Sequence, residues 1–159
     1  RYPLKELIIH PRTQRDFYSG SVHMDFFAYG AEHSLNPVCY NGDIRSEEDM
    51  RALTERFPKL DRVMIGRGLL VNPALHLLLQ GGKMPDKEAL RTFHDRIYQW
   101  YREEMPGIRP VLFKMKELWT YMGQLFQDAG KPLKKIRKAE KPAAYEAAVE
   151  ELFREYHTV

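Results

Sequence analysis

The first half of the chain contains three short apolar runs, each bounded by polar residues or glycine. They are Leu7-Ile8-Ile9, Val38-Cys39-Tyr40 and Val63-Met64-Ile65. Each run has the length of a strand and no alternation of apolar and polar positions, which is typical of strands covered on both faces. We expect these strands to end at His10, at Asn41 and at Gly66.

Helical patterns separate and follow these strands, at about 22–33, 46–57 and 69–79. Strands that alternate with helices predict parallel β/α units. The pattern changes after Gly81-Gly82, and helices are then predicted at about 86–104, 109–127 and 142–155. Gly130 is expected to end the second of these helices, and a basic segment separates it from the last one. We therefore predict an α/β domain over residues 1–81 and a small all-α helical bundle over residues 82–159.

The residues that follow the three strands suggest a binding site. They are His10, then Asn41-Gly42-Asp43, then Gly66-Arg67-Gly68. The carboxyl ends of parallel strands share one edge, which is where such folds place their ligands. A Gly-Arg-Gly turn before a helix offers backbone N–H groups and a guanidinium to a phosphate. Taken alone, that turn could also be an ordinary strand-to-helix connection with a surface arginine.

Composition adds a possible anionic partner to this picture. The chain has 159 residues and a net charge of +3, with 43% hydrophobic and 30% charged residues. Residues 1–81 contain 10 Lys+Arg and 10 Asp+Glu, whereas residues 82–159 contain 15 and 12. The excess in the second half favours an anionic partner, and a solvated basic helix face is the alternative. No apolar stretch approaches the roughly 18 residues of a membrane span, so no membrane association is expected.

The remaining reactive or aromatic residues are predicted to be structural. Cys39 is the only cysteine in the sequence and is expected to be a small core residue. Trp100 and Trp119 lie at helical spacing and are expected in the core, the alternative being a platform on which bases stack. No metal site is predicted, because four histidines lack metal-ligand spacing: His23, His33, His76 and His94.

Together, the motifs are similar to those of the second half of a tRNA-dihydrouridine synthase. In order, they are His10-Pro11-Arg12-Thr13, Tyr18-Ser19-Gly20, the segment from Pro37 to Ile44, and the segment from Val63 to Pro73. Asn-Gly-Asp-Ile and Met-Ile-Gly-Arg-Gly, about 20 residues apart, are the most specific pair. The resemblance covers nearly the whole chain but only about half of the family's fold.

This resemblance implies a fold, a cofactor and a reaction. The family has a flavin-containing TIM (β/α)8 barrel followed by a helical domain that holds tRNA. The three strands would be the sixth, seventh and eighth of the barrel, on the side that binds the FMN phosphate. The implied enzyme is a cytoplasmic, FMN-dependent oxidoreductase that reduces uridine in tRNA to 5,6-dihydrouridine, with NADPH as the reductant of the flavin.

The resemblance also assigns residues to the site. Those expected to hold FMN are His10, near the flavin, and Asn41, Gly42, Asp43, Gly66 and Arg67, around the ribityl chain and phosphate. Arg12 matches an arginine of the family and is grouped with the residues expected to contact tRNA. The others in that group are basic residues of the second half: Lys114, Lys116, Lys131, Lys134, Lys135, Arg137 and Lys138. Such contacts would make RNA binding strongly salt-dependent.

This sequence departs from the family in three ways. Pro11 stands where the family commonly has glycine. The family's catalytic cysteine and a flavin-binding lysine belong to the first half of the barrel, and neither is in this chain. Cys39 does not match the catalytic position, so no catalytic residue is expected here and the chain alone is expected to be inactive. Because it begins at Arg1, we expect it to be a piece of a longer protein.

Two other interpretations are open. The chain could be a non-catalytic RNA-binding module whose half barrel is inert, or a flavin- or phosphate-binding barrel that acts on a small metabolite. The basic helical half argues against the second. Three parallel strands would also leave two open edges, which predicts a homodimer through those edges if the chain is truly truncated.

Overall fold

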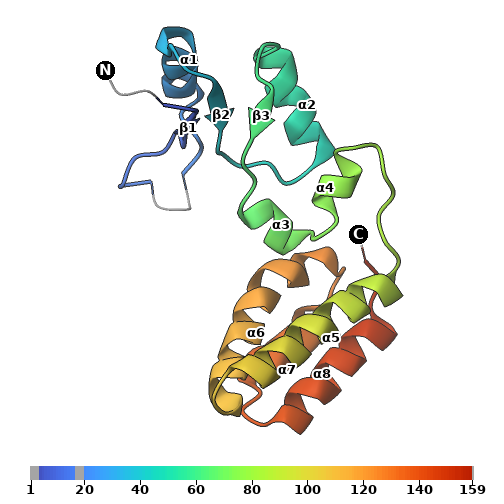
Figure 1. The fold of residues 1–159 in the computed structure, drawn as a ribbon. Helices are drawn as coiled ribbons and strands as arrows, with labels where there is room; N and C mark the ends of the chain where they lie inside the picture. The colour runs from blue at the N-terminus through green and yellow to red at the C-terminus, as the bar shows by residue number, and fades with distance from the viewer. Residues whose placement is uncertain (1–3, 17–19, 159) are drawn as a thin grey trace. The chain divides into compact units, whose positions relative to one another are not determined.

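The computed structural model describes residues 4–16 and 20–158 (Figure 1). The chain divides into two compact units, Arg1–Leu69 and Leu70–Val159. The division lies earlier than the predicted boundary at residue 81. The residues just after Leu70 belong to the second unit, where Asn72 Nδ2 lies 3.6 Å from Met84 Sδ.

The first unit holds a three-stranded parallel sheet in the order β1-β2-β3. The strands are β1 (Leu7–Ile9), β2 (Val38–Tyr40) and β3 (Arg62–Val63). Helix α1 (Met24–His33) connects β1 to β2, and α2 (Glu47–Arg56) connects β2 to β3. The predicted alternation of parallel strands and helices is confirmed, although β3 is shorter than the apolar run that predicted it.

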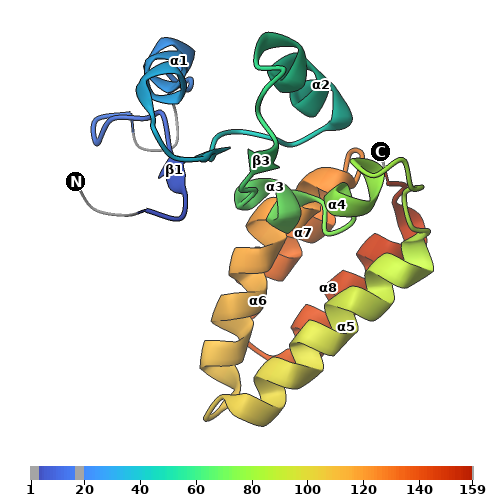
Figure 2. The same ribbon diagram turned by 45° about the horizontal axis from the view of Figure 1, so that its top comes forward.

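Both helices of this unit cover the same face of the sheet (Figure 2). Phe27 of α1 is fully buried. Its ring makes edge contacts with Tyr40 of β2 and with Phe57 at the end of α2, at centroid distances of 4.9 and 5.0 Å. Ile9 faces the same way, because its Cδ1 lies 2.7 Å from the position of a Cβ at Gly30.

The opposite face of the sheet differs from the prediction. The register aligns Ile8 with Cys39, and Cys39 with Arg62. Cys39, in the central strand, is buried as predicted. Ile8 and Met64, in and beside the outer strands, are 45% and 46% exposed. The expectation that the strands are covered on both faces is therefore wrong at these residues. Side chains alternate along a strand, and α1 and α2 cover only the other face.

The apolar stretch at 69–79 forms two short helices rather than the one predicted. They are α3 (Arg67–Val71) and α4 (Leu75–Leu78). Pro73 has no N–H to donate within a helix. The side-chain Oδ1 of Asn72 instead accepts a hydrogen bond from Ala74 N at 2.9 Å. The break therefore has a local cause.

Four longer helices share one hydrophobic core in the second unit (Figure 2). They are α5 (Lys87–Glu104), α6 (Ile108–Met122), α7 (Gly130–Lys138) and α8 (Pro142–Glu155). A 3₁₀ turn, η1 (Gly123–Leu125), follows α6, so this helix ends before the predicted residue 127. The basic segment after Gly130 is helical, which the sequence did not predict. Buried Pro132 and Ile136 hold it against the core.

The tryptophans differ in their surroundings. Trp119 is buried as predicted, but Trp100 is 55% exposed, so its assignment to the core was wrong.

Trp119 belongs to a buried polar network. Its Nε1 donates to Tyr145 Oη at 2.8 Å, and the same hydroxyl lies 2.7 Å from His94 Nε2. His94 Nδ1 lies 2.7 Å from Asp95 Oδ1. Burial lowers the pKa of His94 although Asp95 opposes that shift.

Across the described residues, none of the helices combines the length and the apolar character that crossing a membrane requires.

Candidate functional site

The ends of the three strands meet at one edge of the sheet through Asn41. Its backbone N donates to Ile9 O at 2.9 Å, and its side-chain Nδ2 donates to Met64 O at 2.9 Å. The ring Nδ1 of His10 contacts the backbone O of Asn41. The structure therefore brings together the segments that follow β1, β2 and β3, as their order along the chain suggested.

Asp43 joins two arginines from the other two segments. Arg12 Nη2 donates to Asp43 Oδ2 at 2.5 Å, and Arg67 Nη2 donates to Asp43 Oδ1 at 2.8 Å. Each carboxylate oxygen thus accepts one guanidinium. Two cations share one anion, so this group of three side chains, the Arg12–Asp43–Arg67 cluster, has a formal charge of +1 (2 − 1). A surplus positive charge with planar donors suits an anionic ligand.

Arg12 is the buried member of the cluster. Its side chain is only 3% exposed. Its Nε and Nη1 are buried without a hydrogen-bond partner in the part of the chain that the structure describes. An unsatisfied buried guanidinium N–H is costly, so the burial of Arg12 depends on its ion pair with Asp43. The same burial argues against the predicted contact of Arg12 with RNA phosphates.

The turn around Pro11 directs this arginine inward. Arg12 N donates to His10 O at 2.8 Å, which closes a tight turn at Pro11. The backbone O of Pro11 accepts from His23 N at 2.8 Å, at the start of α1. Because the proline ring restricts φ, the departure from the family at Pro11 stiffens this turn. The motif residues Tyr18 and Ser19 lie outside the described residues.

The two glycines assigned to the site have different surroundings. A Cβ at Gly42 would lie 2.0 Å from the hydroxyl oxygen of Tyr40, so the Tyr40 side chain itself requires glycine there. A Cβ at Gly66 would meet none of the described residues within 4 Å. The backbone beside Arg67 is therefore open to a ligand, whereas that of Gly42 is occupied by the protein.

The lysines predicted to bind RNA fall into two groups. Lys114 pairs with Glu117 at 3.0 Å, and Lys135 pairs with Glu151 at 2.5 Å. The hydrogen bond to a carboxylate raises the pKa of each lysine. No ion pair is found, over residues 4–16 and 20–158, for Lys116, Lys131, Lys134, Arg137 and Lys138. These five residues are the better placed for an anionic partner.

Two residues of α6 were missed by the sequence reasoning. Arg109 and Phe113 are exposed and lie on one side of α6 with Lys116. Their spacing of four and then three residues places them on one helix face, beside the face that is buried in the core. That spacing could have identified them, but the apolar stripe of the same helix drew attention to its other face.

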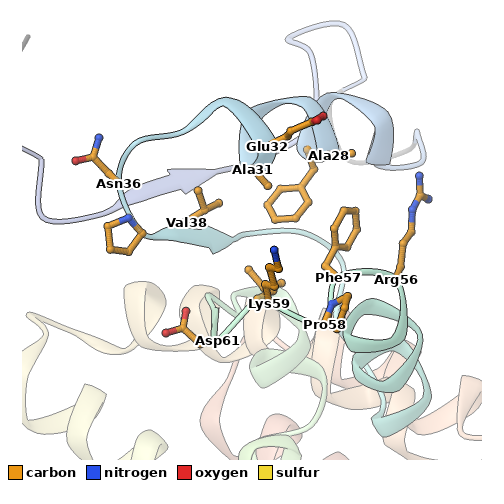
Figure 3. Close-up of a pocket in the computed structure, with 13 residues that line it drawn as sticks. Ala28, Ala31, Glu32, Asn36, Val38, Arg56, Phe57, Pro58, Lys59 and Asp61 are labelled. Atoms are coloured by element: carbon orange, nitrogen blue, oxygen red, sulfur yellow. The ribbon is translucent and has the colours of Figure 1, made fainter.

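A cavity of about 580 Å³ lies in the first unit (Figure 3). Val38, Phe57 and Lys59 are among the side chains that line it. Asn36 precedes β2 and Asp61 precedes β3, so the cavity is near the amino ends of the strands. None of the residues predicted for the cofactor site lines it.

Comparison with known proteins gives the family. A family model described as Dihydrouridine synthase (Dus) matches residues 4–158. The tRNA-dihydrouridine(16) synthase of Pseudomonas syringae pv. tomato is 37% identical over 70 residues, or 44% of this chain and 22% of the relative. The tRNA-dihydrouridine synthase B of Pasteurella multocida is 32% identical over 77 residues, or 48% and 23%.

A longer match is to the tRNA-dihydrouridine(16) synthase of Shewanella oneidensis, which is 23% identical over 134 residues. That match covers 83% of this chain and 42% of the relative. In these matches the chain spans between about a fifth and two fifths of the length of its relatives. The family model covers nearly all of the chain, which therefore belongs to the dihydrouridine synthase family.

Proposed function

We propose that this chain forms the C-terminal part of a tRNA-dihydrouridine synthase that uses FMN. The first unit would supply the last three β/α units of a TIM barrel, and the second a helical tRNA-binding domain. The observation that carries the proposal is the Arg12–Asp43–Arg67 cluster, which lies at the carboxyl edge of a parallel sheet. Phosphate sites are common at this edge of β/α barrels.

The residues present fit the phosphate of such a cofactor. Arg67 is 25% exposed and lies beside the open backbone of Gly66, so it is the residue that would contact the phosphate. Arg12, whose side chain is only 3% exposed, would support the site through its ion pair with Asp43 and not by direct contact with the phosphate. Asp43 would hold both guanidinium groups in place, rather than contact the ribityl chain as the resemblance implied. Asn41 would fix the edge of the sheet, with His10 beside it.

When bound, FMN reduced by NADPH would supply the hydride for the reduction of uridine in tRNA to 5,6-dihydrouridine, and the proton that this reduction also requires would come from outside this chain. The contribution of this chain is to bind and to position, because no residue of it is assigned to proton transfer. Cys39 is buried, and burial raises the pKa of its thiol. We therefore expect the isolated chain to be inactive. The complete enzyme would act in the cytoplasm on a uridine that has left its stack in the folded tRNA.

A titration that compares FMN with riboflavin tests the phosphate contact. Flavin fluorescence would be followed for the full chain, for Arg67→Ala, and for Arg45→Ala as a matched control on an exposed arginine of the loop after β2. Loss of one charge-assisted hydrogen bond, at about 1.5–3 kcal/mol, would weaken FMN binding roughly tenfold to a hundredfold.

We expect Arg67→Ala to remove the preference for FMN over riboflavin, with Arg45→Ala close to the unaltered chain. If the unaltered chain showed no preference for FMN, the proposed phosphate site would be wrong. If it bound neither flavin, the non-catalytic RNA-binding module would be the better interpretation. The cations of α6 and α7 that form no ion pair within the described residues support the RNA-binding module as well as they support the synthase. RNA binding by these side chains would not require a flavin.

A further inference from the structure

The second unit has a hollow surface between α6 and α7, which we call the α6–α7 groove. Two depressions of about 500 and 300 Å³, whose lining residues follow one another along α6, form it. Helix α6 and the residues just after it contribute most of the lining, and α7 with the two residues that follow it contributes the rest. The residues on which the inference depends are Arg109, Phe113, Lys116, Thr120, Gln124 and Arg137.

The helix period explains why the side chains from α6 lie in one line. Residues 109, 113, 116 and 120 are spaced by four, three and four, which places them along one face of the helix. Met115 and Trp119 are buried in the core, and Trp119 also lines the floor of the smaller depression. The groove thus follows one face of α6 and is bordered by Leu133 and Arg137 of α7.

Most of the charge on this surface is positive and unneutralised. Arg109, Lys116 and Arg137 form no ion pair with any residue in the described parts of the chain. Next to Arg137, Lys131, Lys134 and Lys138 lie on the exposed face of α7. Glu140 is the acidic residue among the groove's lining. Such a surface is complementary to a polyanion.

Phe113 adds an aromatic ring to this basic stripe. Its side chain is 68% exposed, so the face of the ring is accessible to a partner. Arg109 precedes it by four residues and Lys116 follows it by three, so a cation lies one helical turn away on each side. An exposed ring between cations is the arrangement by which proteins stack an unpaired base and hold the phosphates on either side of it.

The other exposed aromatic surface of this unit is less suitable for a polyanion. Trp100 lies on α5 in a depression that is also lined by Arg96, Asp95 and Glu103. Two carboxylates there oppose one guanidinium. The two surfaces therefore differ in charge while both present an exposed ring, which makes the α5 surface a useful control.

We propose that the α6–α7 groove binds the backbone of single-stranded or looped RNA, with one unpaired base stacked on Phe113. Arg109, Lys116 and Arg137 contact the phosphates that flank this base. The inference deepens the proposed function, on which the choice of RNA rests, by identifying the binding surface and the structural feature of the RNA that it recognises. Recognition is of an unpaired nucleotide and not of a particular sequence, because stacking tolerates every base.

The test measures binding of labelled RNA to the full chain by fluorescence anisotropy over a series of salt concentrations. One RNA is a hairpin with an unpaired loop, and the other is a duplex of equal length without a loop. The variants are Phe113→Ala and Arg109→Gln, with Trp100→Ala and Arg96→Gln as matched controls on α5. Circular dichroism checks that each variant is folded, which is expected because all four side chains are exposed.

Stacking and phosphate contact give different results in this experiment. Phe113→Ala is expected to weaken hairpin binding roughly tenfold, with little effect on the duplex and none on the salt dependence. Arg109→Gln is expected to weaken the binding of both RNAs. It is also expected to make the slope of log K against log salt shallower by about one, the contribution of one phosphate contact. Trp100→Ala and Arg96→Gln should leave both affinities unchanged.

Several results would overturn the proposal. One is that Phe113→Ala binds the hairpin with the same affinity as the unaltered chain. Another is that Trp100→Ala, and not Phe113→Ala, lowers this affinity. A third is that the unaltered chain binds no RNA at low salt. Competition by an acidic peptide as effective as by unlabelled hairpin would show that the groove is a protein-docking surface. No flavin is used, so failure of the FMN site and failure of the RNA groove are distinguishable.

Discussion

Asp43 shows how one residue can organise a site that three loops share. Its two carboxylate oxygens each accept a different guanidinium, one from the segment after β1 and one from the segment after β3. Arg12 and Arg67 would repel each other without it. Asp43 therefore has a structural role that precedes any contact with a ligand.

The residue scale provides a first prediction. Asp43→Asn keeps the shape of the side chain but removes the charge that balances buried Arg12. Because Asp43 is 31% exposed, water offsets part of this loss, and we expect a decrease of about 1–2 kcal/mol in local stability. Amide hydrogen exchange in β1–β3 would measure it. Asp61→Asn is the control, since Asp61 is 73% exposed and lies 3.9 Å from its arginine.

The buried histidine of the second unit leads to a prediction on pH. Burial lowers the pKa of His94 below its ordinary value of 6.5. The unfolded chain therefore takes up a proton near pH 6.5 that the folded chain does not. The free energy of unfolding should then fall as the pH decreases below about 6.5, by at most roughly 1.4 kcal/mol per pH unit for one group. Above pH 7.5 this contribution is constant.

Burial is the main cause of the preference for neutral His94, and the contact with Tyr145 is compatible with it. Tyr145 Oη accepts from Trp119 Nε1, so its own proton is available to His94 Nε2. Urea unfolding at pH 7.5 and 5.5, followed by the fluorescence of Trp119, would measure the pH effect. The same measurement on His94→Gln should show a smaller difference between the two pH values. An equal difference would assign the effect to other groups.

Helix α2 illustrates the scale of a single element. Ser46 Oγ accepts from Asp49 N at 3.1 Å, and Asp49 Oδ2 accepts from Ser46 N at 3.0 Å. This capping box satisfies two backbone donors at the start of the helix. Ser46→Ala should lower the local stability of α2 by about 1 kcal/mol, whereas Ser46→Thr should largely preserve it. Amide exchange within Glu47–Arg56 would measure the difference. Equal protection in the two variants would contradict it.

The sequence of α7 was insufficient to predict that this segment is helical. Residues 131–141 contain six basic residues, which resembles a solvated segment. Pro132 and Ile136 are separated by one helical turn, and both are buried against the shared core. Two buried residues among so many charges give a weak apolar pattern. The helix is therefore stabilised mainly by tertiary packing, which is common for short helices.

At the scale of the whole molecule, the open sheet predicts self-association. Ile8 and Met64 are exposed on the same face, and β1 and β3 are edge strands in the described sheet. The homodimer predicted from the sequence is untested, and sedimentation of the chain over a range of concentrations would test it. We expect the mean mass to rise with concentration and Ile8→Lys to reduce that rise. A constant monomer mass would contradict the prediction.

The sequence by itself determined the parts of this protein that depend on local patterns. Three apolar runs predicted three parallel strands, and their polar ends predicted one shared edge. Asn41, Asp43 and Arg67 could be assigned to that edge because strand direction fixes where such residues lie. Asp86 and Pro142 marked helix starts that the structure confirms. Family membership also followed from short motifs in a fixed order.

Tertiary structure alone decided which charges are paired and which side chains are buried. Arg12 binds Asp43, 31 residues away, and becomes buried, although the sequence had placed it among the RNA contacts. Lys135 is neutralised by Glu151 on another helix, while Arg137, two residues on, is not. Trp119 is buried and Trp100 is exposed, although both lie at helical spacing. These outcomes depend on partners distant in the chain, and local periodicity contains no information about them.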